Sequence, residues 1–259
     1  MQLTSRLTIK NILTRIGALA QFAFRFIRRV FMPPFEFKET VKQIYDIGVR
    51  SFGLVAVVAI VIGAVLTMQS RPTMIKFGAE AFVPAMVAVS VLRELSPVLV
   101  SVIVAGRVAA GIGAELGSMK VTEQIDAMEV AALDPFNYLV VTRVLACMIA
   151  LPLLTVYADV ISLIGSGIVQ QIEAGMSWQL FYNSVLNSIN FVDFLPGVLK
   201  TIIFGFLIGI VGCFEGYNSS GGTEGVGRSA TDAVVFSSLL ILITDMLVVK
   251  ATVFFFDVG

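Results

Sequence analysis

Five stretches of the chain are apolar over a length that suits a membrane-spanning helix. At a rise of about 1.5 Å per residue, each can cross about 30 Å of hydrocarbon. The second stretch is overlong and contains two prolines, so a kinked, tilted or partly re-entrant course is expected for it. The pattern predicts an all-α integral membrane protein with about five transmembrane helices, at residues 52–68, 82–113, 139–165, 196–214 and 233–256.

Residues 6–31 have a different pattern, in which apolar and basic positions follow helical spacing. One face of the helical wheel is rich in Arg and Lys and the other is apolar, although Phe22 and Phe26 depart from the pattern. Such a helix is typical of the membrane interface, with its cations toward lipid phosphates; a surface helix of a soluble domain is the alternative. We therefore divide the chain into an interfacial region, 1–38, and a transmembrane domain, 39–259. The apolar face consists of Ile9, Leu13, Ile16, Ala20, Ala23, Ile27, Val30 and Phe31.

Composition supports a membrane protein and removes several classes of function. Hydrophobic residues make up 57% and charged residues 14% of the chain, which is too little polar surface for a water-soluble protein. The formal net charge is zero, so we expect no nucleic-acid partner. Histidine is absent, which removes the usual metal ligand and general base. Because no phosphate-binding loop is present either, we expect no metal, no cofactor and no enzymatic activity, and any ATP must be bound by a partner subunit.

The basic residues predict the orientation in the membrane. Nine of the 18 Lys and Arg residues lie at or before Arg50, which places the N-terminus in the cytoplasm. Five spans then place segments 114–138 and 215–232 in the cytoplasm, and segments 69–81 and 166–195 outside. Aromatic residues among Asn and Ser in 170–194 predict a short helix at the outer, periplasmic interface.

The most informative cytoplasmic segment is 115–134, which is acidic and bounded by Pro135. A helix there that exposes Met119, Ile125 and Met128 beside carboxylates would suit docking into a groove of a partner protein. A solvated helical connector is the alternative. Glu123, Asp126 and Glu129 are its candidate polar contacts.

Arg93 and Glu94 lie near the middle of the second span, where ionised side chains are costly and should face protein or water. Arg107 returns to within about 40° of the face of Arg93, so an intramembrane charge network of these three residues is expected. Two roles compete. One is a structural network, with Asp159 or Glu215 as partners; the other is a polar patch that contacts a phosphate headgroup.

Small residues in the spans permit close helix packing. Gly113-x-x-x-Gly117 and Gly205-x-x-x-Gly209 have the spacing of close helix–helix contacts. We expect the chain to assemble as a homodimer, because a closed two-fold interface is the commonest solution for one kind of subunit.

Several motifs together resemble one family. Leu92-Arg-Glu-Leu-Ser-Pro-Val98 is followed by Ala105-Gly-Arg107, by Ala114-Glu-Leu-Gly117 and by Leu133-Asp-Pro135. Gly216-Tyr217 and Gly227-Arg-Ser-Ala-Thr231 extend the similarity toward the C-terminus. On these residues the chain resembles the MlaE/YrbE permeases of the MCE-associated ABC phospholipid transporter, the Mla system, over residues 40 to 256.

The resemblance implies a function and a set of partners. Such permeases are homodimers in the bacterial inner membrane that pair with a cytoplasmic ABC ATPase (MlaF-like) and a periplasmic MCE-domain hexamer (MlaD-like). A STAS-domain protein (MlaB-like) joins through the ATPase. The complex moves phospholipid between the inner and outer membranes and maintains outer-membrane lipid asymmetry. The segment that matches 115–134 holds the coupling helix, with Glu123, Asp126, Met128 and Glu129 as the expected contacts with the ATPase.

The same resemblance suggests where lipid binds. We expect a site between the two subunits, under the MCE ring, walled by the outer end of the first span. An acyl-chain site should be apolar and roomy, although these residues could instead face bulk lipid. The lipid-binding candidates are Leu66, Gln69, Met74 and Phe77, with Arg93 and Glu94.

Three other functions remain open from the residues. An MCE-type permease for another hydrophobic substrate, such as a sterol-like molecule, would share the same fold. A stand-alone channel or secondary transporter would show midplane carboxylates or broken half-helices in two related halves, and no inverted repeat is visible. A lipid-modifying membrane enzyme is disfavoured by the absence of histidine. Only the ABC permeases require an ATPase partner.

Overall fold

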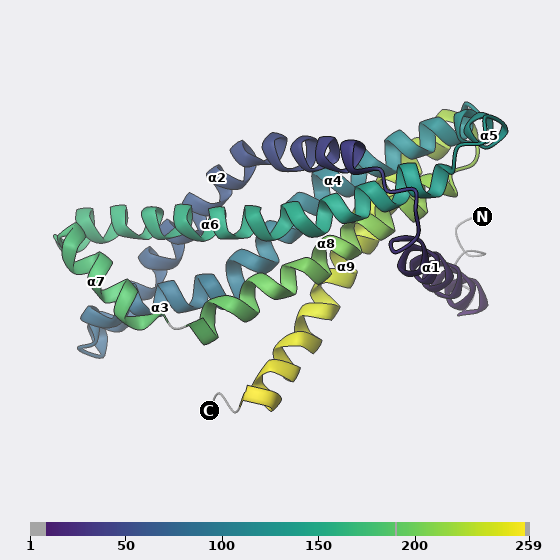
Figure 1. The fold of residues 1–259 in the computed structure, drawn as a ribbon. Helices are drawn as coiled ribbons and strands as arrows, with labels where there is room; N and C mark the ends of the chain where they lie inside the picture. Colours follow the sequence, from purple (N-terminus) through teal and green to yellow (C-terminus); the bar gives the residue numbers. More distant parts are fainter. Residues whose placement is uncertain (1–8, 190, 257–259) are drawn as a thin grey trace.

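The computed structural model describes residues 9–189 and 191–256, and these are helical with no strand among them (Figure 1). The chain order is α1 (Ile9–Arg29), α2 (Phe37–Lys76), η1 (Glu80–Phe82), α3 (Val83–Ser90), η2 (Val91–Leu95), α4 (Ser96–Val121), α5 (Gln124–Val130), η3 (Phe136–Val141), α6 (Thr142–Ala174), α7 (Trp178–Ser188), α8 (Phe191–Tyr217) and α9 (Gly222–Phe256). The predicted all-α class is confirmed.

Five helical segments are long and apolar enough to cross a membrane, as the apolar pattern predicts. They are Phe37–Lys76, Glu80–Val121, Phe136–Ala174, Phe194–Tyr217 and Gly222–Thr252. The first four each contain one predicted stretch and extend beyond it, and the fifth begins before the predicted stretch 233–256 and covers most of it. The first turns of α2 are charged and amphipathic, and ion pairs one turn apart, such as Arg50 with Asp46 at 3.1 Å, support helix there.

The bundle has two distinct ends (Figure 1). At one end, which we call the α5 end, α5 lies beyond the C-terminus of α4, and α1 lies to the side of the bundle. At the other, the α7 end, α7 lies close to η1 and α3. Because five spans separate α1 from the end of α9, those two elements lie toward opposite ends.

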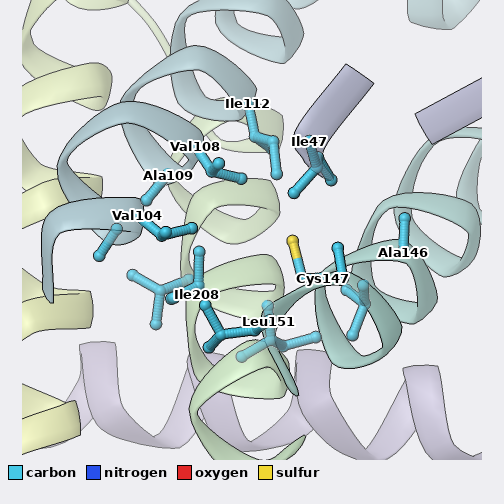
Figure 2. Close-up of a cluster of buried hydrophobic side chains, with 14 of the residues drawn as sticks. Ile47, Val104, Val108, Ala109, Ile112, Ala146, Cys147, Leu151 and Ile208 are labelled. Carbon is cyan, nitrogen blue, oxygen red and sulfur yellow. The ribbon is translucent and has the colours of Figure 1, made fainter. Parts of the chain in front are cut away.

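Helix α6 is the central element, and its glycines allow close packing. A Cβ added to Gly165 would overlap the carbonyl oxygen of Ile60 on α2, and one added to Gly205 on α8 would lie 2.5 Å from the carbonyl oxygen of Cys147. These glycines therefore permit backbone contact with both neighbouring spans. Figure 2 shows the apolar core where α6 meets α2, α4 and α8, formed by Ile47, Val104, Val108, Ala109, Ile112, Ala146, Cys147, Leu151 and Ile208.

The second span is continuous from one end to the other, with one turn of π-helix in its middle. The π-turn, Val91–Leu95, ends two residues before Pro97, which is the second residue of α4. Because proline has no N–H and crowds the preceding turn, a local change of helical geometry is a natural consequence. The expected irregularity is therefore a π-turn, and the partly re-entrant alternative is wrong.

Helix α1 packs against the bundle through Phe22 and Phe26, which the helical wheel did not favour, together with Ala23 and Val30 of the expected apolar face. Phe26 is buried and the Phe22 ring lies 5.1 Å from that of Phe136 and 5.6 Å from that of Phe214. Ile16 and Ile27, on the expected apolar face, are exposed. The helix is thus apolar on two sides, one toward protein and one available to lipid. Residues 6–8 of the predicted helix lie outside the described residues.

The short helix expected in segment 170–194 is α7. Ser177 caps it by accepting a hydrogen bond from the backbone N–H of Leu180 at 3.4 Å. Phe181 is buried, whereas Trp178 and Tyr182 are exposed, as aromatic residues of a membrane interface would be.

Candidate functional site

A cluster of paired charges lies inside the predicted membrane region. Lys200 of α8 donates hydrogen bonds to Glu94 at 2.6 Å and to Asp245 of α9 at 2.8 Å. The Lys200 side chain is only 3% exposed, whereas that of Glu94 is 46% exposed. The two carboxylates offset the cost of burying the ammonium group, and the exposed Glu94 presents the cluster to the surface of the chain.

Local structure explains how these three helices converge. Glu94 lies on the π-turn that precedes Pro97. Gly197, one turn before Lys200, packs its backbone against the carbonyl oxygen of Leu92, so closely that a Cβ there would overlap it. This contact brings α8 against the π-turn and places Lys200 within reach of Glu94.

Arg107 makes a separate contact nearer the α5 end. It donates to the hydroxyl of Ser51 at 2.6 Å and to the backbone carbonyls of Asp46 and Ile47 at 3.4 Å. The expected network of Arg93, Glu94 and Arg107 is therefore divided: Glu94 joins α8 and α9, and Arg107 joins α4 to α2. Arg93 lies beside Glu94 on the π-turn and is partly buried.

Neither carboxylate proposed as a partner for the arginines takes that role. Glu215 instead accepts from Arg15 of α1 at 2.6 Å. Asp159 of α6 is 3% exposed, and its oxygens have no hydrogen-bond partner among the described residues; Ser96 is its polar neighbour. The Asp159 carboxyl is therefore buried away from water, and no cation among the described residues lies beside it to offset the cost of burying a charge.

The coupling candidates lie on and beside α5. Glu123, Asp126 and Glu129 are exposed, and Asp126 pairs with Lys120 at 2.8 Å. The expectation that Ile125 is exposed is wrong, because it is buried, and Met128 packs in part against the core of its own chain. The exposed apolar side chains are Val130, at 90%, and Leu133. A partner surface at this end would therefore meet Val130 first.

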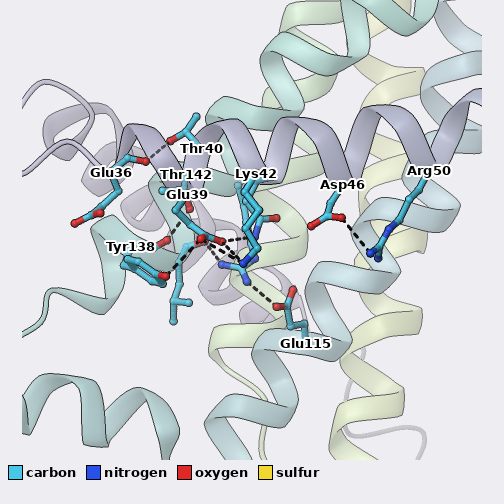
Figure 3. A network of polar contacts seen from close by, with 12 residues as sticks. Glu36, Glu39, Thr40, Lys42, Asp46, Arg50, Glu115, Tyr138 and Thr142 are labelled. Carbon is cyan, nitrogen blue, oxygen red and sulfur yellow. Dashed lines mark hydrogen bonds and ion pairs between the residues drawn. The ribbon is translucent and has the colours of Figure 1, made fainter.

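A second charged network, at the α5 end, joins η3 to the start of α2. Glu39 accepts hydrogen bonds from Lys42, Gln43 and Tyr138. Figure 3 shows Glu39 beside Lys42 and Tyr138, with Arg50 paired to Asp46 farther along α2. Nearby, the buried Arg143 of α6 pairs with Glu115 of α4 at 2.9 Å. These contacts connect three spans at the α5 end. A displacement of α4 there would therefore act on α6 through the Arg143–Glu115 ion pair.

The lipid-binding candidates divide between two environments at the α7 end of α2. Leu66 and Met74 pack against Val83, Val87 and Val91 of the second span. Gln69 and Phe77 are exposed. The structure thus brings the first pair onto the second span and leaves the other pair on the outer surface of the chain.

The described residues thus form a multi-pass helical bundle with paired charges in its membrane region and an exposed acidic helix at one end. Residues 40–251 match the family model for Permease MlaE. The chain belongs to the MlaE permease family. It is therefore the membrane subunit of an ABC transporter in a family that implies lipid transport, is not itself an enzyme, and works with an ATPase subunit.

Relatives from different organisms support that assignment. A probable ABC transporter permease protein of Rickettsia typhi is 40% identical over 235 residues, covering 91% of both chains. One from Synechocystis is 37% identical over 208 residues, covering 80% of this chain and 79% of the relative. The chloroplastic protein TRIGALACTOSYLDIACYLGLYCEROL 1 of Arabidopsis thaliana is 31% identical over 233 residues, which is 90% of this chain and 66% of that protein.

Sequence reasoning missed Lys200 and Asp245. Both interrupt apolar stretches, at 196–214 and 233–256, and carry opposite charges. Since charges within a membrane are expected to pair, their opposite signs were a usable signal. The pairing of Lys200 with Glu94 could not be predicted, because the π-turn that directs Glu94 toward α8 has no simple sequence pattern.

Proposed function

We propose that this chain is the permease of an ABC transporter that moves phospholipids between the inner and outer membranes of a bacterium and so maintains outer-membrane lipid asymmetry. It would act as a homodimer in the inner membrane, with the N-terminus and the α5 end in the cytoplasm. The single observation that carries the proposal is the match to the MlaE family over residues 40–251. The Arabidopsis relative is named after a galactolipid, which supports a diacylglycerol-based lipid as the cargo.

The exposed surface of α5 supports contact with the ATPase. Glu123, Asp126 and Glu129 offer carboxylates, and Val130 offers an apolar side chain that nothing in the described residues covers. Apolar anchors ringed by charges are typical of helix-in-groove contacts. The Arg143–Glu115 pair then provides a physical connection from α4, which precedes α5, into α6.

The α7 end would receive the external partner. The MCE-domain hexamer would cover this end, and the STAS-domain protein would join through the ATPase at the other end. Gln69 and Phe77, exposed at the α7 end of α2, would then wall the lipid route between two copies of the chain. Glu94, half exposed in the middle of the second span, lies farther from the α7 end, toward the centre of the membrane.

The proposal is tested on α5. The double variant Met128→Ala/Glu129→Lys should uncouple ATP hydrolysis from lipid movement or weaken copurification of the ATPase. Glu224→Lys is a matched control, because Glu224 is an exposed carboxylate on the first turn of α9. Transport and assembly left intact by the double variant would rule out the coupling role, and a chain that never copurifies an ATPase would overturn the proposed function.

A further inference from the structure

Two adjoining cavities lie beside the segment that connects α1 to α2. One, of about 480 Å³, is lined by Gln21, Phe24, Arg25, Arg28, Arg29 and Met32. The other, of about 250 Å³, lies between the start of α2, η3 and the start of α6. They share Arg29 and Met32. The larger is an open hollow along α1 and the smaller is more enclosed, so together they have room for a headgroup and part of one acyl chain.

The smaller cavity has the polarity gradient of a lipid. Asn137, Val141, Leu145 and Ile149 all line it and recur every fourth residue, so they lie on one helical face. This row extends about 18 Å from an amide toward the membrane interior at 1.5 Å per residue. Val41 and Ile44 of α2 form the facing wall. The cavity is therefore polar at the α5 end and apolar farther in.

Asn137 brings an unsatisfied amide to the lining of the smaller cavity. Its side chain is 3% exposed and lines the cavity, yet neither its amide nitrogen nor its amide oxygen has a hydrogen-bond partner among the described residues. Buried amides are nearly always hydrogen-bonded, because leaving one unsatisfied is costly. An ester carbonyl could accept from the amide nitrogen, and a hydroxyl could donate to the oxygen.

The larger cavity supplies the complementary charge. Its three arginines outnumber the two carboxylates near them, Asp134 and Glu36: Arg29 pairs with Asp134 at 2.7 Å, Glu36 lines the smaller cavity, and Arg25 lies over the ring of Phe136 at 4.2 Å. A guanidinium group has five N–H donors, so donors remain for the oxygens of a phosphate. The surrounding surface is apolar, with Phe31 and Phe35 exposed, and so faces the bilayer that would deliver the ligand.

We propose that these two cavities bind one anionic glycerophospholipid, such as phosphatidylglycerol, from the membrane leaflet at the α5 end. Its phosphate contacts Arg25, Arg28 and Arg29, its ester region contacts Asn137, and one acyl chain lies along Val141, Leu145 and Ile149. The site is at the opposite end from Gln69 and Phe77, so the lipid is a bound constituent that fastens α1 to the bundle, distinct from the transported lipid. This inference does not depend on the proposed direction or cargo of transport.

Native mass spectrometry of the purified full-length chain tests the site. The chain is titrated with phosphatidylglycerol and with phosphatidylcholine that carry identical acyl chains. We expect tighter binding of phosphatidylglycerol by about tenfold or more.

Each arginine should contribute about fivefold to the affinity for phosphatidylglycerol, so Arg25→Gln/Arg28→Gln should weaken binding by about 25-fold. Arg228→Gln is the control, because Arg228 is exposed at the same end and pairs with Glu224 at 2.9 Å; it should leave binding unchanged. Equal affinity for the two lipids, or equal losses in both variants, would overturn the proposal.

Two further measurements separate a lipid from a free phosphate and guard against misfolded variants. Excess sn-glycerol 3-phosphate should fail to displace phosphatidylglycerol; full displacement would mean that the site takes a free phosphate, against the proposal. Phosphatidylglycerol with a diazirine on its acyl chain, applied to the unmodified chain, should label the peptide containing Leu145 and Ile149. Labelling confined to other helices would contradict the assigned site, whatever the stability of the variants.

Discussion

Helices α6 and α9 are both long membrane-spanning helices, but the chain uses them differently. In the most apolar window of α6, 61% of residues are buried within the chain, against 17% for α9. The face of α6 that is buried is polar along much of its length, at Thr155, Asp159, Ser162, Ser166 and Gln170. Between Val235 and Leu247 the exposed residues of α9 are large and apolar: Val235, Leu239, Leu242, Ile243, Met246 and Leu247.

The difference shows what holds such a bundle together. Lipid is as apolar as a leucine side chain, so burying apolar surface gives little reason for one span to prefer another. Helix α6 is held by close backbone contacts and polar groups, such as the hydrogen bond from Thr67 of α2 to Ser166 at 2.7 Å. Helix α9 packs against α4, where a Cβ added to Gly113 would lie 3.1 Å from the carbonyl oxygen of Ser229, and the ion pair of Asp245 with Lys200 anchors it to α8 within the membrane. Its free apolar face is open to lipid or to a second copy of the chain.

The largest effect is expected where the anchor of α9 is removed. Lys200→Met leaves Glu94 and Asp245 close together without their cation, and removing one partner of a buried ion pair costs about 3–5 kcal/mol. The free energy of unfolding, measured by titration with a denaturing detergent, should fall by that amount. Lys250→Met, at an exposed lysine near the end of α9, should change the free energy of unfolding little. Equal changes in the two variants would mean that the charge cluster does not anchor α9.

A smaller effect is expected at the close contact of α6 with α2. Gly165→Ala forces a methyl group against the backbone of Ile60, and such overpacking costs about 1–3 kcal/mol. Gly111→Ala on α4 is the matched control, since a Cβ there meets nothing within 4 Å. The control should be neutral, or stabilise the helix by up to about 1 kcal/mol. The same unfolding titration separates them, and a neutral Gly165→Ala would show that α2 and α6 are less closely packed.

The smallest effect is expected on the exposed face of α9. Met246→Ala should change the unfolding free energy of the chain by less than about 0.5 kcal/mol, because no described residue covers this side chain. The self-association of the same variant, measured by sedimentation in detergent, shows whether this face of α9 contacts a second copy of the chain or lipid. Weakened association would assign the face to the homodimer, and unchanged association would assign it to lipid.

The sequence predicted the elements better than their contacts. Hydropathy is a local property, so all five spans, α5 and α7 could be located in advance. Phe22 and Phe26 departed from the apolar wheel of the N-terminal helix because a single wheel assumes one buried face, whereas α1 has protein on one side and an exposed apolar surface on another. The pairing of Glu94 with Lys200 joins residues 106 positions apart. It depends on a π-turn and on Gly197, and neither is visible as periodicity.

ATP-dependent movement of phospholipid is the most direct test of the central claim. The chain and its ATPase are reconstituted in vesicles that contain a labelled phospholipid, and transfer to unlabelled acceptor vesicles is followed with and without ATP. The account predicts transfer that requires ATP and is lost in Met128→Ala/Glu129→Lys, but persists in Glu224→Lys. Phospholipid transfer that is the same with and without ATP, or ATP-dependent transfer of a sterol but of no phospholipid, would contradict it.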